Sequence, residues 1–364
     1  MKTKAAVLYE PHSPLRIEEV DLGPVKAHDV LVKIVASGVC HSDLHVYHGQ
    51  AGWPLPMVLG HEGAGIVQEV GSAVTQVQPG GHIIVNLAPY CGHCRECAQG
   101  FIYRCTVMRG PAGFLYDGET RLSKDGKPVH HYVNSATYAH HAIIHESSAI
   151  AIPKSIPLDV ACLVGCSLPA GMGAVLNGVP IKPGSSVVVI GCGSVGLNVL
   201  QGARLSGAGK IIAVDVLESK LATARDFGAT DIIDASMENV VESVVELTGG
   251  GADYAYEVVG KVEPMMDAFR SIRRGGVAVM VGVAPDGSEL PINPRELLQE
   301  KTITGVSFGS TRAPKDFPMY LDLYQAGKIN IDELITRRGT LEDINEAFAD
   351  LEKGEVVRTV LLME

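Results

Sequence analysis

Four cysteines in one short segment form the strongest chemical signal of the sequence. They are spaced as Cys91-x2-Cys94-x2-Cys97-x7-Cys105. Four thiolates spaced in this way can close a tetrahedral zinc site with no open position, which is typical of a structural metal. An iron–sulfur cluster and a pair of disulfides are the alternatives. We favour zinc because intracellular thiols stay reduced and zinc is the usual metal of four thiolates.

A second group of potential metal ligands is dispersed along the chain. Cys40 opens the run Cys-His-Ser-Asp-Leu-His45, His61 and Glu62 lie in Gly-His-Glu-Gly, and Cys166 lies in Val-Gly-Cys-Ser. Any one of these residues alone would more often belong to the core than to a metal site. Two cysteines and one histidine together supply three ligands and leave a fourth position open, which is the arrangement of catalytic zinc.

A glycine motif follows an apolar β-branched run. Val187–Ile190 leads into Gly191-Cys192-Gly193-Ser194-Val195-Gly196. The first glycine permits a tight turn, the second lets the backbone approach a pyrophosphate, and the third lets helix and strand pack closely. The alternative is a glycine-rich turn without a ligand. Asp215 ends the next apolar run, where a carboxylate accepts hydrogen bonds from the adenosine ribose and repels a 2′-phosphate, so we predict NAD rather than NADP.

Composition limits the class of protein. A chain of 364 residues exceeds one ordinary domain and suits two. With 46% hydrophobic and 20% charged residues it is globular, which excludes disorder, collagen and coiled coil. A net charge of −11 argues against nucleic acids and anionic membranes as partners. Because no apolar run is long enough to span a membrane and the N-terminus lacks a secretory core, we expect a cytoplasmic protein that binds small molecules.

The pattern of elements changes near residue 165. Before it, short β-branched runs separated by Gly and Pro predict a mostly antiparallel β region. The expected strands there are 5–9, 15–20, 30–36, 64–70 and 83–85. All thirteen histidines lie at or before His145. The polar, ligand-bearing loops therefore belong to this first region.

From about residue 185, strands alternate with helical patterns. The expected strands are 187–190, 211–214, 232–233, 254–259, 277–283 and 302–306, and the expected helices are one through Leu200, 219–227, 240–247 and 264–272. This alternation predicts a parallel, doubly wound sheet. A helix at 341–351 and a strand at 356–363 should return to the first region. The apolar edge strand 302–306 favours pairing between copies of the chain.

These motifs together resemble the zinc-dependent medium-chain alcohol dehydrogenase family, and most of all its liver-type branch. The similarity runs from end to end and includes Gly126-Lys-Pro-Val-His-His131 and Arg358-Thr-Val. It implies a GroES-like catalytic domain at 1–167 and 308–364, with a structural zinc lobe at about 90–106, and a Rossmann NAD-binding domain at 168–307. It also implies two zinc ions per chain and a homodimer or homotetramer.

The resemblance assigns roles around the dispersed ligands. It implies an active-site zinc held by Cys40, His61 and Cys166, with Glu62 as a possible transient ligand. Asp43 resembles the carboxylate that orients the ligand histidine.

The resemblance also implies a proton relay and a set of coenzyme contacts. Ser42 and His45 match residues that pass a proton from the bound alcohol, through the nicotinamide ribose, to solvent. A solvated loop histidine is the alternative for His45. The remaining implied NAD contacts are His41, Lys220, Val281, Val283, Val306, Phe308 and Arg358.

The substrate follows least directly from the sequence. By the resemblance, Leu87 and Ala51 stand at pocket positions that are often bulkier in enzymes for small alcohols, which favours medium-chain, aromatic or terpenoid primary alcohols. Secondary alcohols, which would give ketones, are an alternative substrate class. The segment Thr106–Tyr116 at the pocket border is shorter than in the liver-type branch, so the substrate does not carry over from that branch.

Two other functions are alternatives to this one. The first is the thiol-dependent formaldehyde dehydrogenase branch, which oxidises S-hydroxymethyl thiol adducts. Arg109 falls near that branch's anion-binding arginine, but the loop Gly49–Trp53 has no acidic residue to hold the amine end of glutathione. The second is a non-catalytic zinc- and dinucleotide-binding regulator, against which the full ligand set argues.

Several conspicuous residues have a simpler interpretation. The pairs His130-His131 and His140-His141 should face opposite sides of strands, so we expect packing or surface roles rather than chelation. Trp53, the only tryptophan, either lines the substrate channel or caps its loop.

Overall fold

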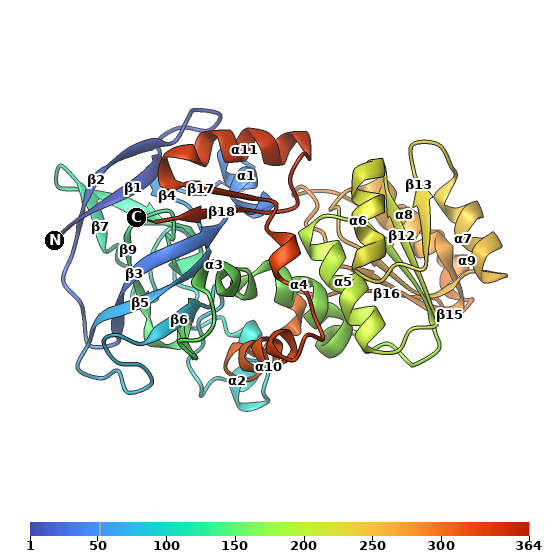
Figure 1. Cartoon of the computed structure of the whole chain (residues 1–364), viewed down its shortest axis with the longest axis horizontal. Coiled ribbons are helices and arrows are strands. Elements are labelled where there is room, and N and C mark those ends of the chain that lie inside the picture. Colours follow the sequence, from blue (N-terminus) through green and yellow to red (C-terminus); the bar gives the residue numbers. More distant parts are fainter. Residues whose placement is uncertain (51, 364) are drawn as a thin grey trace. The chain divides into compact units, whose positions relative to one another are not determined.

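The computed structural model describes residues 1–50 and 52–363. The pocket expectation for Ala51 falls outside these described residues. The chain forms two compact units, Met1–Cys166 with Arg312–Glu364, and Ser167–Thr311. Figure 1 colours the chain by residue number, so the two segments of the first unit appear in blue to green and in red. The red strand β18 lies beside the blue strand β3, with which it pairs.

The first unit contains a small closed barrel. Its strands are, in order around the barrel, β1 (Lys2–Leu8), β2 (Arg16–Leu22), β7 (Leu122–Lys124), β8 (Lys127–His131) and β4 (Met57–Val58). Each strand pairs antiparallel with its neighbours, except that β4 and β8 run parallel. Closure leaves the barrel without free edges, because every strand has a neighbour on both sides.

A seven-stranded sheet forms the rest of this unit's framework. Its order is β10 (Ala149–Ile152), β6 (His82–Val85), β5 (Glu62–Val70), β3 (Asp29–Gly38), β18 (Thr359–Leu362) and β17 (Arg337–Thr340), with β9 (His141–His145) pairing with β3 as well. The expected return of the C-terminal strand to the first region corresponds to β18, which pairs antiparallel with β3. The central strand β3 is almost wholly buried, as its apolar sequence requires.

The helices of the first unit are short apart from two. They are α1 (His41–Tyr47), α2 (Arg95–Ala98), α3 (Leu158–Ala161), α10 (Ala313–Gln325) and α11 (Ile344–Lys353). Helix α11 buries Ile344, Ala347, Phe348 and Leu351, which recur at helical spacing on one face. It ends at Gly354, whose φ of 73° closes the helix in the left-handed conformation that glycine adopts freely.

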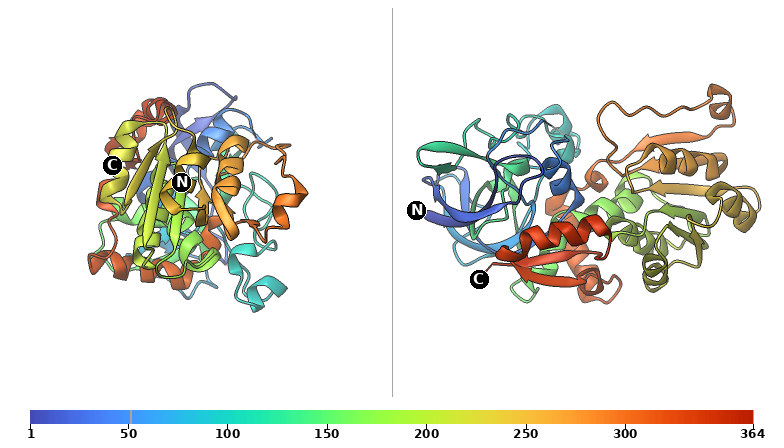
Figure 2. Two further views of the ribbon diagram at one scale, coloured as in Figure 1. Left: turned by 90° about the vertical axis from the view of Figure 1, so that its right-hand side faces the viewer. Right: turned by 90° about the horizontal axis from the view of Figure 1, so that it is seen from above.

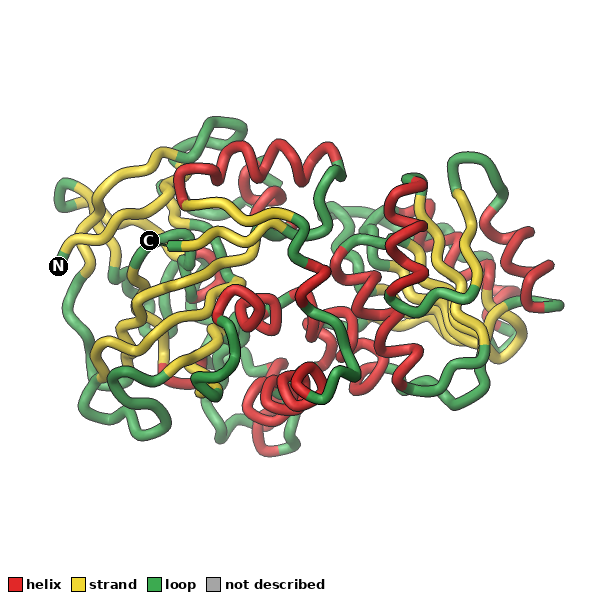
Figure 3. The backbone as a smooth tube through the Cα atoms, in the orientation of Figure 1, coloured by secondary structure: helices red, strands yellow, loops and turns green. Residues whose placement is uncertain are grey.

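The second unit is a six-stranded, wholly parallel sheet. Its order is β13 (Asp231–Asp234), β12 (Lys210–Asp215), β11 (Ser186–Ile190), β14 (Ala252–Glu257), β15 (Ile272–Met280) and β16 (Thr302–Gly305). Its helices are α4 (Ser167–Gly173), α5 (Ser194–Leu205), α6 (Glu218–Asp226), α7 (Val240–Thr248), α8 (Val262–Ser271) and α9 (Pro294–Leu297). Helices cover both faces of the sheet (Figures 2 and 3). The predicted doubly wound α/β fold is therefore confirmed.

The strand order fixes where this sheet can bind a ligand. Numbered within the unit, the order runs 3-2-1-4-5-6, so the connections change direction between β11 and β14. In such sheets a ligand binds outside the carboxyl ends of the strands at this point.

Among the described residues no single helix is long and apolar enough to cross a membrane. One bent pair, Leu158–Gly165 with Ser167–Gly178, meets that criterion by length and composition only.

Candidate active site and metal centres

The four-cysteine lobe gathers its sulfur atoms at one point. The Sγ atoms of Cys91, Cys94, Cys97 and Cys105 all lie within 4.8 Å of one another. The Sγ atoms are 4.0 Å apart for Cys91 and Cys97 and 3.9 Å apart for Cys94 and Cys105, and all four residues are free thiols. Four converging thiols without another donor fit a closed zinc site.

The dispersed ligands also meet at one point. One donor atom each from Cys40, His61, Glu62 and Cys166 lies within 4.8 Å of the others. Cys40 caps the start of α1 directly after β3, and His61 and Glu62 stand where β5 begins. The antiparallel register of β3 and β5 pairs Gly38 with Glu62, and this pairing brings the two segments together.

A buried carboxylate, Asp43, contacts the histidine of this group. The Asp43 carboxylate is fully buried, and its Oδ1 lies 3.3 Å from His61 Nδ1 and accepts a hydrogen bond from Gly60 N at 3.0 Å. With the Nδ1 proton donated to Asp43, the Nε2 lone pair of His61 is free for a metal.

A buried cation lies beside the two cysteines. Arg358 is 3% exposed, donates to the Val39 carbonyl at 2.6 Å, and has its Nη1 3.5 Å from Glu62 Oε1. A hydrogen bond from Cys166 and the charge of Arg358 hold the pKa of the Cys40 thiol well below its usual range, against the effect of burial. Burial raises the pKa of Glu62 to about 7. The site thus favours a thiolate, which is the form that binds metal. The pyrophosphate contact expected of Arg358 stays a prediction.

The expected relay residues lie on α1. Ser42 Oγ is 3.6 Å from Cys40 Sγ, and the Ser42 carbonyl accepts a hydrogen bond from the Tyr132 hydroxyl at 3.0 Å. His45 follows three residues after Ser42, on the same side of the helix. His41 is the first residue of that helix.

The aromatic ring of Tyr132, which the sequence did not single out, borders the candidate ligand His61 and contacts Trp53. Tyr132 packs edge-on against His61, with ring centroids 5.4 Å apart, and against Trp53 at 5.1 Å. The ring of Trp53 is therefore part of a packed aromatic wall. Leu87 is half-buried.

The glycine motif forms an open cradle at the end of β11. Gly191 has a φ of 101°, and α5 begins directly after Gly193. A Cβ on Gly196 would lie 1.8 Å from the Gly191 carbonyl oxygen, so only glycine fits there, whereas a Cβ on Gly193 would meet nothing within 4 Å. Open backbone at a helix N-terminus on the switch point of the sheet fits a pyrophosphate.

Asp215 and several other expected coenzyme residues lie at strand ends or on helices of the second unit. Asp215 Oδ2 accepts from Cys192 N, inside the glycine motif, at 2.8 Å, and its Oδ1 accepts from Val216 N at 2.8 Å. Lys220 lies on α6, and Ser194 and Val195 begin α5. The expected nicotinamide contacts Val281, Val283, Val306 and Phe308 follow the carboxyl ends of β15 and β16.

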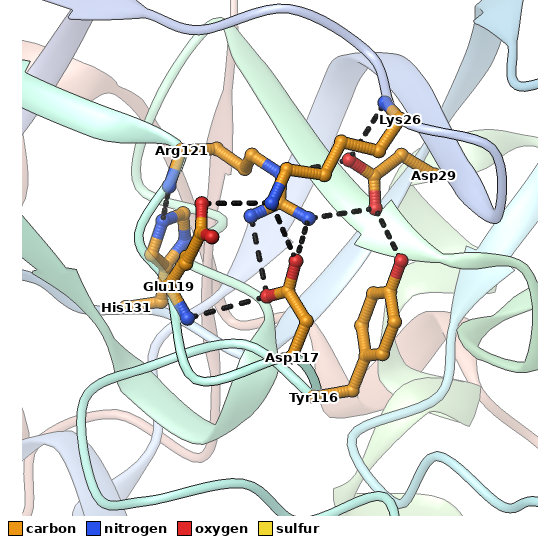
Figure 4. Close-up of polar contacts among 7 residues, drawn as sticks. All are labelled: Lys26, Asp29, Tyr116, Asp117, Glu119, Arg121 and His131. Atoms are coloured by element: carbon orange, nitrogen blue, oxygen red, sulfur yellow. Dashed lines mark hydrogen bonds and ion pairs between the residues drawn. The ribbon is translucent and has the colours of Figure 1, made fainter.

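A separate charged network ties the segment after the four-cysteine lobe to β3 (Figure 4). Arg121, 3% exposed, donates to Asp29 at 2.7 Å and to Asp117 at 2.8 Å. The Tyr116 hydroxyl donates to Asp29 at 3.2 Å, and His131 Nε2 accepts from Arg121 N at 3.0 Å. His131 is therefore a buried structural residue.

A third cluster of ligand types involves His28, His145 and Glu146. His28 Nδ1 pairs with Glu146 at 2.6 Å. His145 Nδ1 accepts from Ser147 N at 3.1 Å and lies 2.8 Å from its hydroxyl, which places the ring proton on the other nitrogen. The lone pair of His145 is therefore already engaged in a hydrogen bond, and we assign no metal to the cluster.

Comparisons with known proteins agree with this geometry. The chain matches the family models of an alcohol dehydrogenase GroES-like domain over residues 26–154 and of a zinc-binding dehydrogenase over residues 194–326. It is 40% identical over 374 residues to S-(hydroxymethyl)glutathione dehydrogenase of Paracoccus denitrificans, with 100% of both chains covered.

Two solved structures share the whole fold. One is an alcohol dehydrogenase zinc-binding domain protein from Burkholderia ambifaria, with 34% identity, a TM-score of 0.95, and 100% of this chain and 99% of the other covered. The other is benzyl alcohol dehydrogenase from Acinetobacter calcoaceticus, with 32% identity, a TM-score of 0.95 and 100% of both chains covered.

The chain therefore belongs to the zinc-dependent medium-chain alcohol dehydrogenase family, as the resemblance implied. It is an oxidoreductase, which sets aside the non-catalytic regulator. Membership implies zinc and a nicotinamide dinucleotide as cofactors.

Proposed function

We propose that the chain is an NAD-dependent alcohol dehydrogenase that reversibly converts primary alcohols into aldehydes at a zinc held by Cys40, His61 and Cys166. The observation that carries the proposal is the meeting of these three donors with Glu62 within 4.8 Å. Three firm ligands and one carboxylate able to approach or withdraw leave a position for substrate. The closed four-cysteine lobe suits a structural zinc instead.

The cofactors divide the chemistry with the protein. Zinc supplies the Lewis acidity that lowers the pKa of an alcohol, and NAD accepts the hydride. The protein holds the ligands: Asp43 fixes the ring of His61, and Arg358 offsets the negative charge of the thiolates. The Ser42 hydroxyl, beside the Cys40 sulfur, is placed to take a proton, and His45 on the same helix face is suited to pass it to water.

Asp215 supports NAD as the coenzyme. Its carboxylate stands at the end of β12 and is already held by the backbone of the glycine motif. A 2′-phosphate placed there would meet this negative charge. We expect the enzyme to work in the cytoplasm, where its thiols stay reduced, as a homodimer or homotetramer.

The aromatic wall of Trp53 and Tyr132 favours aromatic alcohols among the expected substrates. The ring of Tyr132 lies against His61, and Trp53 packs against Tyr132. Flat apolar surfaces of this kind pack well on a benzyl group. The similarity to a benzyl alcohol dehydrogenase points the same way. Medium-chain and terpenoid primary alcohols fit the same apolar surface, and secondary alcohols, giving ketones, are part of the proposal.

A second candidate substrate is an S-hydroxymethyl thiol adduct. The similarity to S-(hydroxymethyl)glutathione dehydrogenase favours it, and the exposed Arg109 offers a cation for a carboxylate of such an adduct. Against it stands the loop 49–53, which contains no acidic residue for the glutathione amine.

A panel of substrates tests the proposal. Purified enzyme and NAD are assayed at 340 nm with ethanol, hexanol, benzyl alcohol, geraniol, and formaldehyde with glutathione. We expect the highest kcat/KM for benzyl alcohol or geraniol. If only formaldehyde with glutathione gives NADH, and Arg109→Ala raises its KM, the second candidate replaces the first. If no member of the panel gives NADH in zinc-loaded enzyme, the proposed substrate class is wrong.

A further inference from the structure

A tyrosine hydroxyl is buried directly behind the metal ligands. Tyr138 is fully buried, and its hydroxyl donates to Asp43 Oδ2 at 2.8 Å, with the Gly38 carbonyl further away at 3.3 Å. Burial and the nearby Asp43 carboxylate raise the pKa of Tyr138 far above its usual value, so the hydroxyl keeps its proton and remains a donor.

This contact completes the hydrogen bonding of Asp43. The Oδ1 atom accepts from Gly60 N and faces His61, while Oδ2 accepts from Tyr138 and, at 3.3 Å, from Cys40 N. A carboxylate has about four lone-pair sites, so all of them are used. The Tyr138 contact is the shortest of the four. Without it, Oδ2 would keep only its long bond to Cys40, and because Asp43 is fully buried, no water could replace the hydroxyl.

The ring of Tyr138 has a separate role in shaping the ligand loop. A Cβ on Gly60 would lie 2.5 Å from Cδ1 of Tyr138, and Gly60 adopts a φ of 87°. Tyr138 N also donates to the Leu59 carbonyl at 3.0 Å. A phenylalanine at this position would keep the ring packing and these backbone contacts. The conservative variant therefore isolates the hydroxyl.

We propose that Tyr138 is a positioning residue of the catalytic metal site, whose hydroxyl fixes the Asp43 carboxylate that orients His61. The inference rests on the proposed function, since it takes His61 as a zinc ligand. A ligand histidine whose partner carboxylate can rotate holds its metal less firmly. Loss of such outer partners typically lowers metal affinity about 10- to 100-fold.

Zinc release measures this directly. The purified zinc-loaded enzyme is mixed with a colorimetric chelator, and zinc leaves in two phases, one per site. The phase absent from Cys40→Ala is the catalytic one. We expect Tyr138→Phe to accelerate the catalytic phase by about 10-fold, the lower end of the range for outer partners, and to leave the four-cysteine phase unchanged.

Tyr256→Phe is the matched control. Tyr256 is also fully buried, and its hydroxyl donates to the Val179 carbonyl at 2.7 Å in the other unit. It should change neither phase.

Two results would overturn the inference: release from Tyr138→Phe at the wild-type rate, or equal acceleration of both phases. In either case, alcohol oxidation by the two-zinc wild type would leave the proposed function standing. If the wild type itself releases zinc in a single phase that Cys40→Ala retains, the proposed function and this inference both fail.

Discussion

Asp215 gives the residue-scale test of coenzyme choice. Asp215→Asn keeps an oxygen that can accept from Cys192 N but removes the charge that we propose binds the ribose. A hydrogen bond to a charged group contributes about 1.5–3 kcal/mol, so kcat/KM for NAD should fall about 10- to 150-fold while that for NADP rises. Steady-state kinetics with both coenzymes checks this. An unchanged ratio of the two kcat/KM values would mean that Asp215 does not discriminate between them.

His131 gives a pH dependence at the same scale. Burial, and then the charge of Arg121, lower its pKa to about 3 in the folded chain, against about 6.5 in the unfolded chain. Below pH 6.5 the unfolded chain therefore binds a proton that the folded chain refuses, so stability falls as pH falls from about 6.5 towards 3. Between pH 7.5 and 5.5 the free energy of unfolding should drop by about 1.4 kcal/mol from this group.

The variant His131→Gln isolates that contribution. Its amide oxygen can still accept from Arg121 N but does not titrate. Urea unfolding at the two pH values should show a smaller drop in the variant than in the wild type, by about 1.4 kcal/mol. Zinc loss at low pH affects both proteins alike. Equal drops would show that the pKa of His131 is the same in the folded and the unfolded chain, which would contradict its depression by burial.

At the scale of elements, Arg121 joins the segment after the four-cysteine lobe to β3. Arg121→Met would leave the carboxylate of Asp29 buried without its cation. Breaking one side of a buried ion pair costs about 3–5 kcal/mol. We expect the thermal midpoint to fall accordingly, and the double variant with Asp29→Asn to recover part of the loss. A single variant as stable as the wild type would contradict the role of this pair.

Local patterns in the sequence predicted the elements that are long or strongly patterned. The strands β11 and β12 are mostly apolar runs bounded by turns, and their alternation with helices shows the sheet type. The barrel strands β4 and β7, of two and three residues, were not predicted because such short runs have no periodicity. Pairing with distant strands forms them instead.

The sites divide in the same way, into one formed by a local sequence pattern and one formed by residues far apart in the chain. The four-cysteine lobe is local, so its spacing alone predicted it. The dispersed group needs the pairing of β3 with β5, which no short window contains. Ligand type alone suggested that Cys40, His61 and Cys166 could act together, and the family resemblance assigned them to one zinc in advance. The bond between Tyr138 and Asp43 spans 95 residues and carries no motif. No pattern in the sequence could have predicted it.

At the scale of the whole molecule, two candidate zinc sites lie in one unit, and the sheet that we propose binds the dinucleotide lies in the other. The central claim is that catalysis depends on the zinc at Cys40, His61 and Cys166, while the four-cysteine zinc only supports the fold. Cys40→Ala removes one ligand of the first centre and leaves every sulfur of the second in place.

The most direct measurement is therefore the rate of NADH formation from NAD and benzyl alcohol, for the wild type and Cys40→Ala, with the zinc content of each sample. We predict two zinc ions and turnover in the wild type, and one zinc ion with a rate at least 1,000-fold lower in the variant, because loss of Lewis-acid stabilisation of several kcal/mol costs about that much. Turnover by Cys40→Ala at the wild-type rate, with one zinc ion bound, would contradict the account.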